Sequence, residues 1–144
     1  MWQRIQTLYL LIAAGLVAVL AFGTKAVRFV VENGETVRET VAYAAYWPYL
    51  VLTLLLGALH LLALTTYKIR VFQMRTAALA ALIALALQVW LGVDYFTADD
   101  QVVFRFTAVF PFLIAILDLL AARAIAMDEA MVQSASRLRS ARRR

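Results

Sequence analysis

The stretch YLVLTLLLGALHLLALTTY, residues 49–67, contains no charged side chain and decides the fold class of this chain. As an α-helix it reaches about 28 Å, close to the bilayer hydrocarbon thickness of about 30 Å. Three further apolar segments of similar length lie at residues 5–22, 76–93 and 105–125. Because none of the segments alternates apolar and polar residues as a strand does, the sequence predicts an all-α membrane protein with four transmembrane helices.

The overall composition agrees with this prediction. The chain is 65% hydrophobic and 16% charged, whereas a soluble domain is roughly half apolar and about a quarter charged. Met1–Gly23 also resembles a signal peptide, because a basic start and an apolar stretch precede small residues. We expect this segment to be retained as the first transmembrane helix.

The charges between the apolar segments predict an orientation. The N-terminus, the second loop, the end of the fourth segment and the C-terminal tail carry ten basic residues against three acidic ones. The first and third loops carry four basic residues against six acidic ones. Because positively charged loops stay in the cytoplasm, we predict a multi-pass protein of the bacterial inner membrane with both termini cytoplasmic.

The first outer loop carries a β-hairpin signal at residues 26–41. Two runs rich in β-branched residues flank Glu32-Asn33-Gly34-Glu35. Asn-Gly between such runs is typical of a two-residue hairpin turn, because both central positions need positive φ. We predict a short hairpin over the outer end of the bundle, with an ordered loop without strands as the alternative.

Residues 1–126 are predicted to form the transmembrane domain, and residues 127–144 a basic cytoplasmic tail that continues the fourth helix. Met127, Met131 and Leu138 fall near one helical face, and five arginines lie among the last eight residues. We therefore expect an amphipathic helix that binds anionic lipid. Nucleic acid is not expected as a partner, because no base-stacking aromatic residues accompany the charge.

Three strongly polar side chains lie within the predicted spans: His60, Gln88 and Asp118. Ionisable residues inside a membrane are costly and are candidates for function. His60 and Asp118 fall at similar depth, so a hydrogen bond between them is geometrically possible, whereas Gln88 lies nearer the outer side and needs another partner. The pair fits a proton relay or a structural link between helices, and Asp118 has Arg123 or cytoplasmic water as alternative partners.

The composition argues against most catalytic chemistry. The chain has no Cys and a single His, so thiolate catalysis, Cys-ligated metals and a bis-histidine haem have no ligands. It also lacks a Gly-rich phosphate loop and a Ser-His-Asp set. Asp94, Asp99 and Asp100 are more readily explained as a solvated outer loop than as a divalent cation site. We expect no enzyme activity, no catalytic residues, no cofactor and no metal.

Three motifs carry a resemblance to a known family. They are QRIQTLYLL at residues 3–11, YKIRVFQMR at residues 67–75, and LAARAIAMDE at residues 120–129 with Ser134 and Arg137-Leu138-Arg139 beyond it. Together they resemble an uncharacterised family, a domain of unknown function, of small four-helix membrane proteins from the Bacteroidetes lineage. The resemblance implies an inner-membrane location and no known activity. All three motifs fall on the predicted cytoplasmic side, where they form either a functional surface or merely basic anchoring segments.

The sequence therefore predicts a non-enzymatic scaffold or accessory subunit that docks partners at its cytoplasmic face. The expected partners are the lipid bilayer and other membrane-protein subunits or further copies of the chain. The alternative is a small transporter or proton-handling protein that uses His60 and Asp118. The candidate docking residues are basic: Arg4, Lys68, Arg70, Arg75, Arg123, Arg137 and Arg139.

Overall fold

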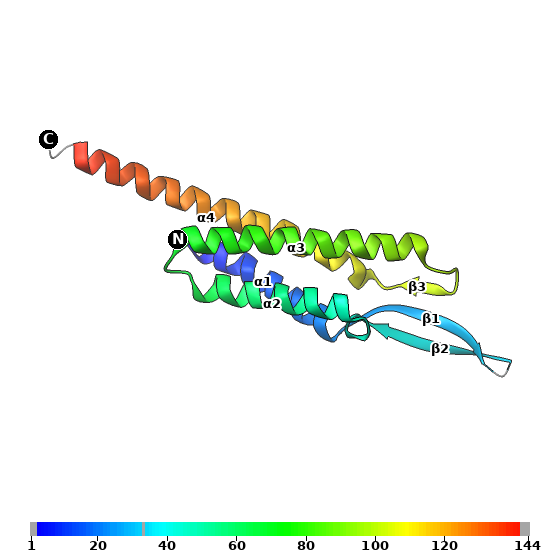
Figure 1. The fold of residues 1–144 in the computed structure, drawn as a ribbon. Helices are drawn as coiled ribbons and strands as arrows, with labels where there is room; N and C mark the ends of the chain where they lie inside the picture. The colour runs from blue at the N-terminus through cyan, green and yellow to red at the C-terminus, as the bar shows by residue number, and fades with distance from the viewer. Residues whose placement is uncertain (1–2, 33, 142–144) are drawn as a thin grey trace.

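The fold is a bundle of four long helices with a small β-sheet at one end (Figure 1). The computed structural model of the protein describes residues 3–32 and 34–141, and it describes side chains between residues 5 and 136. Both α1 and α4 have their chain-terminal ends away from the sheet, and α4 extends beyond the other helices (Figure 1). The helices are α1 (Gln3–Phe22), α2 (Trp47–Thr65), α3 (Arg70–Thr97) and α4 (Phe110–Ala141).

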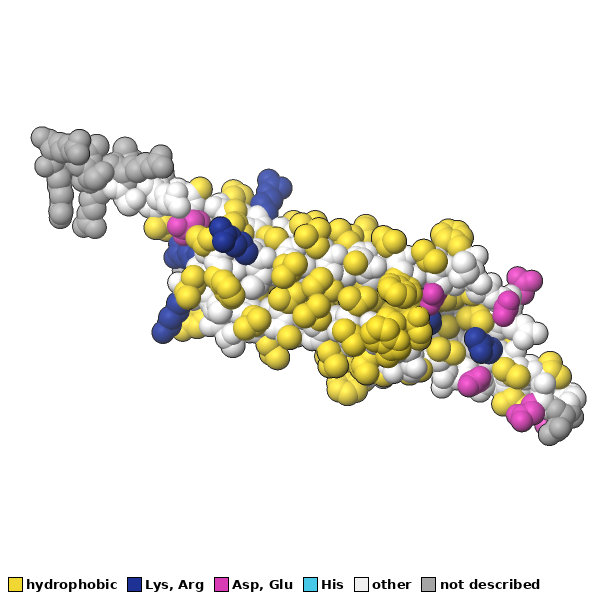
Figure 2. All heavy atoms as spheres, in the orientation of Figure 1, with side chains coloured by type: hydrophobic (Ala, Val, Ile, Leu, Met, Phe, Trp, Pro, Cys, Tyr) yellow, Lys and Arg dark blue, Asp and Glu magenta, His cyan; other side chains and the backbone are white. Residues whose placement is uncertain are grey.

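All four helices are long and apolar enough to cross a membrane, which confirms the four predicted apolar helices. The structure buries only 28% to 39% of each apolar window, so most of these side chains face outward. Figure 2 shows this apolar surface as a band across the middle of the face in view. Dark blue basic side chains gather at the end away from the sheet, and magenta acidic side chains gather mostly at the sheet end (Figure 2).

The helices form a closed ring. Each helix packs against the next one in sequence, and α4 returns to pack against α1. It follows that α2 and α4 lie diagonally across the bundle. The face that α3 buries consists largely of Ala77, Ala80, Ala81 and Ala84, each no more than 1% exposed. Such small side chains let neighbouring helices approach closely in a membrane, where no hydrophobic effect draws one helix to another.

The helix bounds differ from the apolar segments because hydropathy marks only the part that fits the hydrocarbon layer. Helix α3 begins at Arg70, six residues before the predicted start, and continues to Thr97, four residues past the predicted end. Helix α4 begins five residues late, at Phe110, because the 3₁₀ turn η2 (Phe106–Val109) precedes it. Pro111 is then the second helical residue, where its missing N–H costs no helical hydrogen bond.

The predicted hairpin forms, and a third strand joins it. Strands β1 (Thr24–Glu32) and β2 (Glu35–Ala42) pair antiparallel up to Glu32 and Glu35, and Gly34 has φ of 85°. Strand β3 (Val102–Phe104) pairs with the other edge of β1, so the sheet order is β2-β1-β3. The sequence predicts only two strands here, because a three-residue strand is too short to show alternation. The 3₁₀ turn η1 (Tyr43–Ala45) then leads into α2.

Gly23 makes the tight exit from α1 into β1 possible. A Cβ atom at this position would collide with the carbonyl oxygen of Val19, in the last turn of the helix. At Gly15, in the same helix, a Cβ would meet no atom within 4 Å. The two glycines therefore differ in their tolerance of a methyl group.

We expect Gly23→Ala to lower the free energy of unfolding by about 1–3 kcal/mol, because the helix end must distort to relieve the collision. Gly15→Ala is the matched control and should be neutral or stabilising, because alanine favours a helix. Thermal unfolding of the purified protein in a mild detergent compares the two. Equal stabilities of the two variants would contradict the assigned role of Gly23.

Candidate functional site

His60 on α2 and Asp118 on α4 form a hydrogen bond across the bundle. His60 Nε2 lies 3.0 Å from Asp118 Oδ1, and the two side chains are 1% and 0% exposed. The other ring nitrogen, Nδ1, lies 2.8 Å from the carbonyl oxygen of Leu56, one turn earlier in α2. The contact thus joins the two diagonal helices, which are not neighbours in the ring.

The two hydrogen bonds of His60 fix the number of protons on the pair. A carbonyl oxygen only accepts hydrogen bonds, so Nδ1 carries a proton and donates it to Leu56. The Nε2–Oδ1 bond then needs one further proton, which is held either by the imidazole or by the carboxyl group. In both cases the pair as a whole is neutral, which is the arrangement that a low-dielectric interior favours.

The pair lies between two apolar parts of the core. On one side are Leu56 and Ile114, and on the other are Ala63 and Ala121, each one turn or less from His60 or Asp118. The second carboxyl oxygen, Oδ2 of Asp118, is buried without a hydrogen-bond partner among the described residues. The site is therefore sealed, and neither His60 nor Asp118 lines any of three grooves on the described surface, one at the α2–α3 turn and two near the sheet.

Gln88 has a separate partner, as its depth predicts. Its side-chain Oε1 accepts a hydrogen bond of 3.1 Å from the backbone N–H of Phe112, in the first turn of α4. The first N–H groups of a helix have no partner within the helix. Gln88 on α3 thus caps the start of α4, which is a structural role.

At the end of the bundle away from the sheet, a second buried contact joins α1 to α4. Gln6 Nε2 donates a hydrogen bond of 2.7 Å to Asp128 Oδ2, and both side chains are largely buried. Gln6 belongs to the first sequence motif and Asp128 to the third. Two motifs that are 122 residues apart in the chain therefore meet at this end.

The second motif reaches the same place. A groove of about 510 Å³ lies between the start of α1, the end of α2 and the start of α3. Its walls include Gln6 from the first motif and Tyr67, Arg70 and Gln73 from the second. We call this the inner groove. All three motifs that carry the family resemblance thus converge on one end of the bundle.

The comparison with protein families agrees with these motifs. The family model described as Domain of unknown function (DUF4293) matches residues 2–138. The chain belongs to this family. No curated protein and no solved structure matches the chain. The uncharacterised family is thereby confirmed, whereas the bacterial lineage stays a prediction.

The candidate docking residues differ in how they are placed. Lys68, Arg75 and Arg123 are exposed, and Arg70 is half-buried in the wall of the inner groove. Among the described residues, no carboxylate lies within ion-pair distance of these four cations. The side chains of Arg4, Arg137 and Arg139 lie outside the described side chains, although their backbones belong to α1 and α4.

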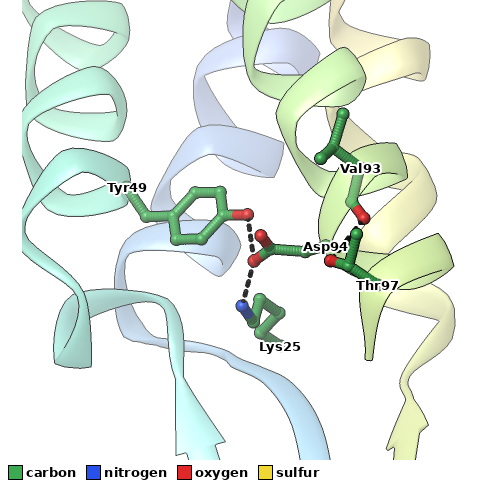
Figure 3. Close-up of polar contacts among 5 residues, drawn as sticks. All are labelled: Lys25, Tyr49, Val93, Asp94 and Thr97. Carbon is green, nitrogen blue, oxygen red and sulfur yellow. Dashed lines mark hydrogen bonds and ion pairs between the residues drawn. The ribbon is translucent and has the colours of Figure 1, made fainter. Parts of the chain in front are cut away.

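At the sheet end, one partly buried cluster ties the sheet to the bundle (Figure 3). Asp94 Oδ2 accepts hydrogen bonds from Lys25 Nζ at 2.6 Å and from Tyr49 Oη at 2.5 Å. Lys25 Nζ also lies 4.6 Å from the centre of the Tyr49 ring, within range of a cation–π contact. Because these residues come from β1, α2 and α3, the cluster fixes three elements at once (Figure 3).

A chain of hydroxyl groups extends this link. Tyr43 in η1 donates to Thr107 Oγ1 at 3.4 Å, and Thr107 donates to the carbonyl of Thr24 at 3.1 Å. Burial raises the pKa of the Tyr43 phenol, so that it stays neutral and able to donate. Lys25 and Asp94 line a groove of about 220 Å³ together with Arg28 and Asp99, and of these four charged residues Lys25 and Asp94 pair with each other.

No group of three His, Asp or Glu side chains in the described part of the chain is placed to hold a metal ion. Asp94 pairs with Lys25, although the sequence groups it with Asp99 and Asp100 as one acidic loop. Sequence reasoning missed this contact and the Gln6–Asp128 contact, because it treated the charges as loop charges. Similar depth on α1 and α4 is a sequence signal for the Gln6–Asp128 contact, whereas Lys25 lies on β1 and gives no such signal.

Replacing Asp118 tests whether the His60 contact holds the bundle together. Asp118→Ala should destabilise the protein because it leaves His60 Nε2 unpaired, and Asp118→Asn should destabilise it less because an amide can donate to that nitrogen. We expect a double-mutant cycle of His60→Ala and Asp118→Ala to give a coupling of about 0.6–1.7 kcal/mol. Unfolding in detergent provides the measurement.

Leu119→Ala serves as the control for that series, because Leu119 is the next residue in α4 but is exposed on the outside of the bundle. It should change stability little. A coupling near zero, or equal effects of Asp118→Asn and Asp118→Ala, would contradict the structural link.

Proposed function

We propose that the protein crosses the bacterial inner membrane four times, with both termini in the cytoplasm, and acts without catalysis as a scaffold or accessory subunit. Its partners dock at the end of the bundle that carries the chain termini and the α2–α3 turn. We call this end the inner end. The convergence of the three family motifs on the inner end is the observation that carries the proposal.

The charge distribution supports the orientation. Lys68, Arg70, Arg75 and Arg123 lie at or near the inner end, whereas Glu32, Glu35, Glu39, Asp99 and Asp100 lie at the sheet end. The apolar band in Figure 2 separates the two groups. Basic segments are retained in the cytoplasm during insertion, so the inner end is the cytoplasmic one.

The surface at the inner end supports docking in two ways. Lys68, Arg75 and Arg123 have no carboxylate partner among the described residues and remain free to pair with an acidic surface. Helix α4 also continues past the bundle (Figure 1), where Met127, Met131 and Val132 are about half exposed. Met-rich helical surfaces adapt readily to protein partners.

The alternative is a small transporter or proton-handling protein centred on His60 and Asp118. A buried pair that shares one proton supports it, because intramembrane ionisable residues often belong to proton pathways. Two features favour a structural role instead. The pair is sealed from the three grooves, and the described helices are unbroken, whereas transporters commonly use interrupted helices.

The orientation can be tested with single cysteines, because the chain contains none of its own. Glu35→Cys at the hairpin and Ser136→Cys near the end of α4 place one thiol at each end of the bundle. In intact cells we expect a membrane-impermeant maleimide to label the Glu35→Cys variant only, and permeabilisation to allow labelling of Ser136→Cys. Labelling of Ser136→Cys alone in intact cells would invert the proposed topology.

Docking at the inner end can be tested by purifying the tagged protein from its own membrane in mild detergent and identifying what co-elutes. We expect a stoichiometric membrane-protein partner that is lost, with the fold intact, from a chain lacking residues 133–144 or carrying Arg75→Glu and Arg123→Glu. Arg105→Glu is the matched control, because this exposed arginine lies near the sheet. Equal loss with Arg105→Glu, or no partner at all, would count against docking at the inner end.

A further inference from the structure

The inner groove has a polar end and an apolar end, arranged along the helix axes. Tyr67 and Arg70 line it at the α2–α3 turn, beside Gln73. Leu64 lies one turn further into α2, and Leu8 and Leu11 follow Gln6 along α1 toward the middle of the bundle. Its volume of about 510 Å³ falls within the range of small-molecule sites, roughly 300–1,000 Å³.

The polar end holds groups that lack a partner within the described chain. The Gln73 side chain is 4% exposed, lines the groove and makes no hydrogen bond to another described residue. Arg70 beside it has no carboxylate within ion-pair distance among the described residues. The Gln73 amide is not among the described side-chain atoms that are buried without a partner, so it is open to the groove and available to a polar occupant at this end. The cation of Arg70 selects an anionic one.

The apolar end of the groove is suited to binding a hydrocarbon chain. Leu8 and Leu11 are more than half exposed, at 52% and 59%, and they line the groove wall together with Leu64. In the proposed orientation these leucines lie within the hydrocarbon layer, and Arg70 lies at its cytoplasmic boundary. Along the groove, a positive charge comes first, then hydrogen-bonding groups, then leucines. A phospholipid in the same leaflet has complementary groups in the same order, from its headgroup to its acyl chain.

We infer that the inner groove binds one anionic phospholipid of the cytoplasmic leaflet. Its phosphate accepts hydrogen bonds from Arg70 and from the Gln73 amide, and one acyl chain covers Leu8, Leu11 and Leu64. A lipid fits better than free phosphate, because phosphate alone would leave the leucines uncovered. The inference rests on the membrane orientation proposed above, and it deepens that proposal by naming a ligand of the inner end. Basic sites on the cytoplasmic side of membrane proteins recognise anionic headgroups in this way.

Native mass spectrometry of the full-length protein, titrated with phosphatidylglycerol or phosphatidylcholine of identical acyl chains, tests this site. We expect the wild-type protein to retain one phosphatidylglycerol at least about fivefold more tightly than phosphatidylcholine, the effect of one basic contact with an anionic headgroup. Arg70→Gln should remove this preference, and Gln73→Leu should reduce it. Arg105→Gln is the control, because this exposed arginine lies near the sheet and outside the groove lining.

Leu11→Trp tests the apolar end, because a larger side chain should fill it and weaken the binding of both lipids. Arg70→Lys keeps the charge and should retain a preference for phosphatidylglycerol if Arg70→Gln proves too unstable to purify. The proposed lipid site is overturned if the wild type binds both lipids equally, or if Arg105→Gln acts like Arg70→Gln. It is also overturned if soluble glycerol phosphate displaces the lipid at similar concentration, which would indicate a free phosphate site.

The lipid site and the docking surface can be disproved independently, because the two experiments change different residues. Docking is tested with Arg75, Arg123 and the residues from 133 onward, whereas lipid binding is tested with Arg70, Gln73 and Leu11. A lipid-free protein whose Arg70→Gln variant loses a co-purifying partner would show that a protein segment occupies the inner groove. That result would overturn the lipid site and leave docking at the inner end supported.

Discussion

A polar side chain inside an apolar bundle has no water to bind, so it must find its partner within the protein. His60 and Asp118 satisfy this constraint on the two helices that lie diagonally across the ring. Packing of neighbouring helices already restricts their axial shift, because ridges of side chains on one helix fit into grooves on the next. A hydrogen bond of fixed length between diagonal helices allows one register, and the apolar layers on either side then pack in that register.

At the ends of the bundle, polar side chains depend less on partners within the protein, because water can reach them. At the sheet end, Lys25, Tyr49 and Asp94 meet around one carboxylate oxygen and hold β1 against α2 and α3. At the inner end, Gln6 and Asp128 tie α1 to α4. Each helix therefore takes part in a buried or partly buried polar contact, and these contacts lie at three different heights along the bundle. The apolar surface between them is largely exposed, as suits helices that are long and apolar enough to cross a membrane.

The sequence predicts those parts of the fold that depend on one segment at a time. Length and apolarity predict the four helices, and Asn33-Gly34 between β-branched runs predicts the hairpin. Strand β3 depends on pairing with β1, a segment far away in the chain, and has too few residues for a pattern of its own. Lys25 and Asp94 look like ordinary loop charges in the sequence, because only the packing of β1 against the ends of α2 and α3 brings them together. Equal depth makes the His60–Asp118 contact possible, but depth alone does not choose between neighbouring and diagonal helices.

The two ends of the bundle differ in whether their polar side chains find hydrogen-bond partners within the protein. This difference bears most directly on function. Lys25, Asp94, Tyr49, Tyr43 and Thr107 at the sheet end bond to one another or to nearby backbone, so the polar groups of this cluster are satisfied within the protein. At the inner end, the side chains of Arg70 and Gln73 line a groove without bonding to any described residue, although Gln73 is almost fully buried. Polar side chains that make no hydrogen bond within the described protein, such as those of Arg70 and Gln73, are available to bind a ligand. The three family motifs lie at the same end of the bundle.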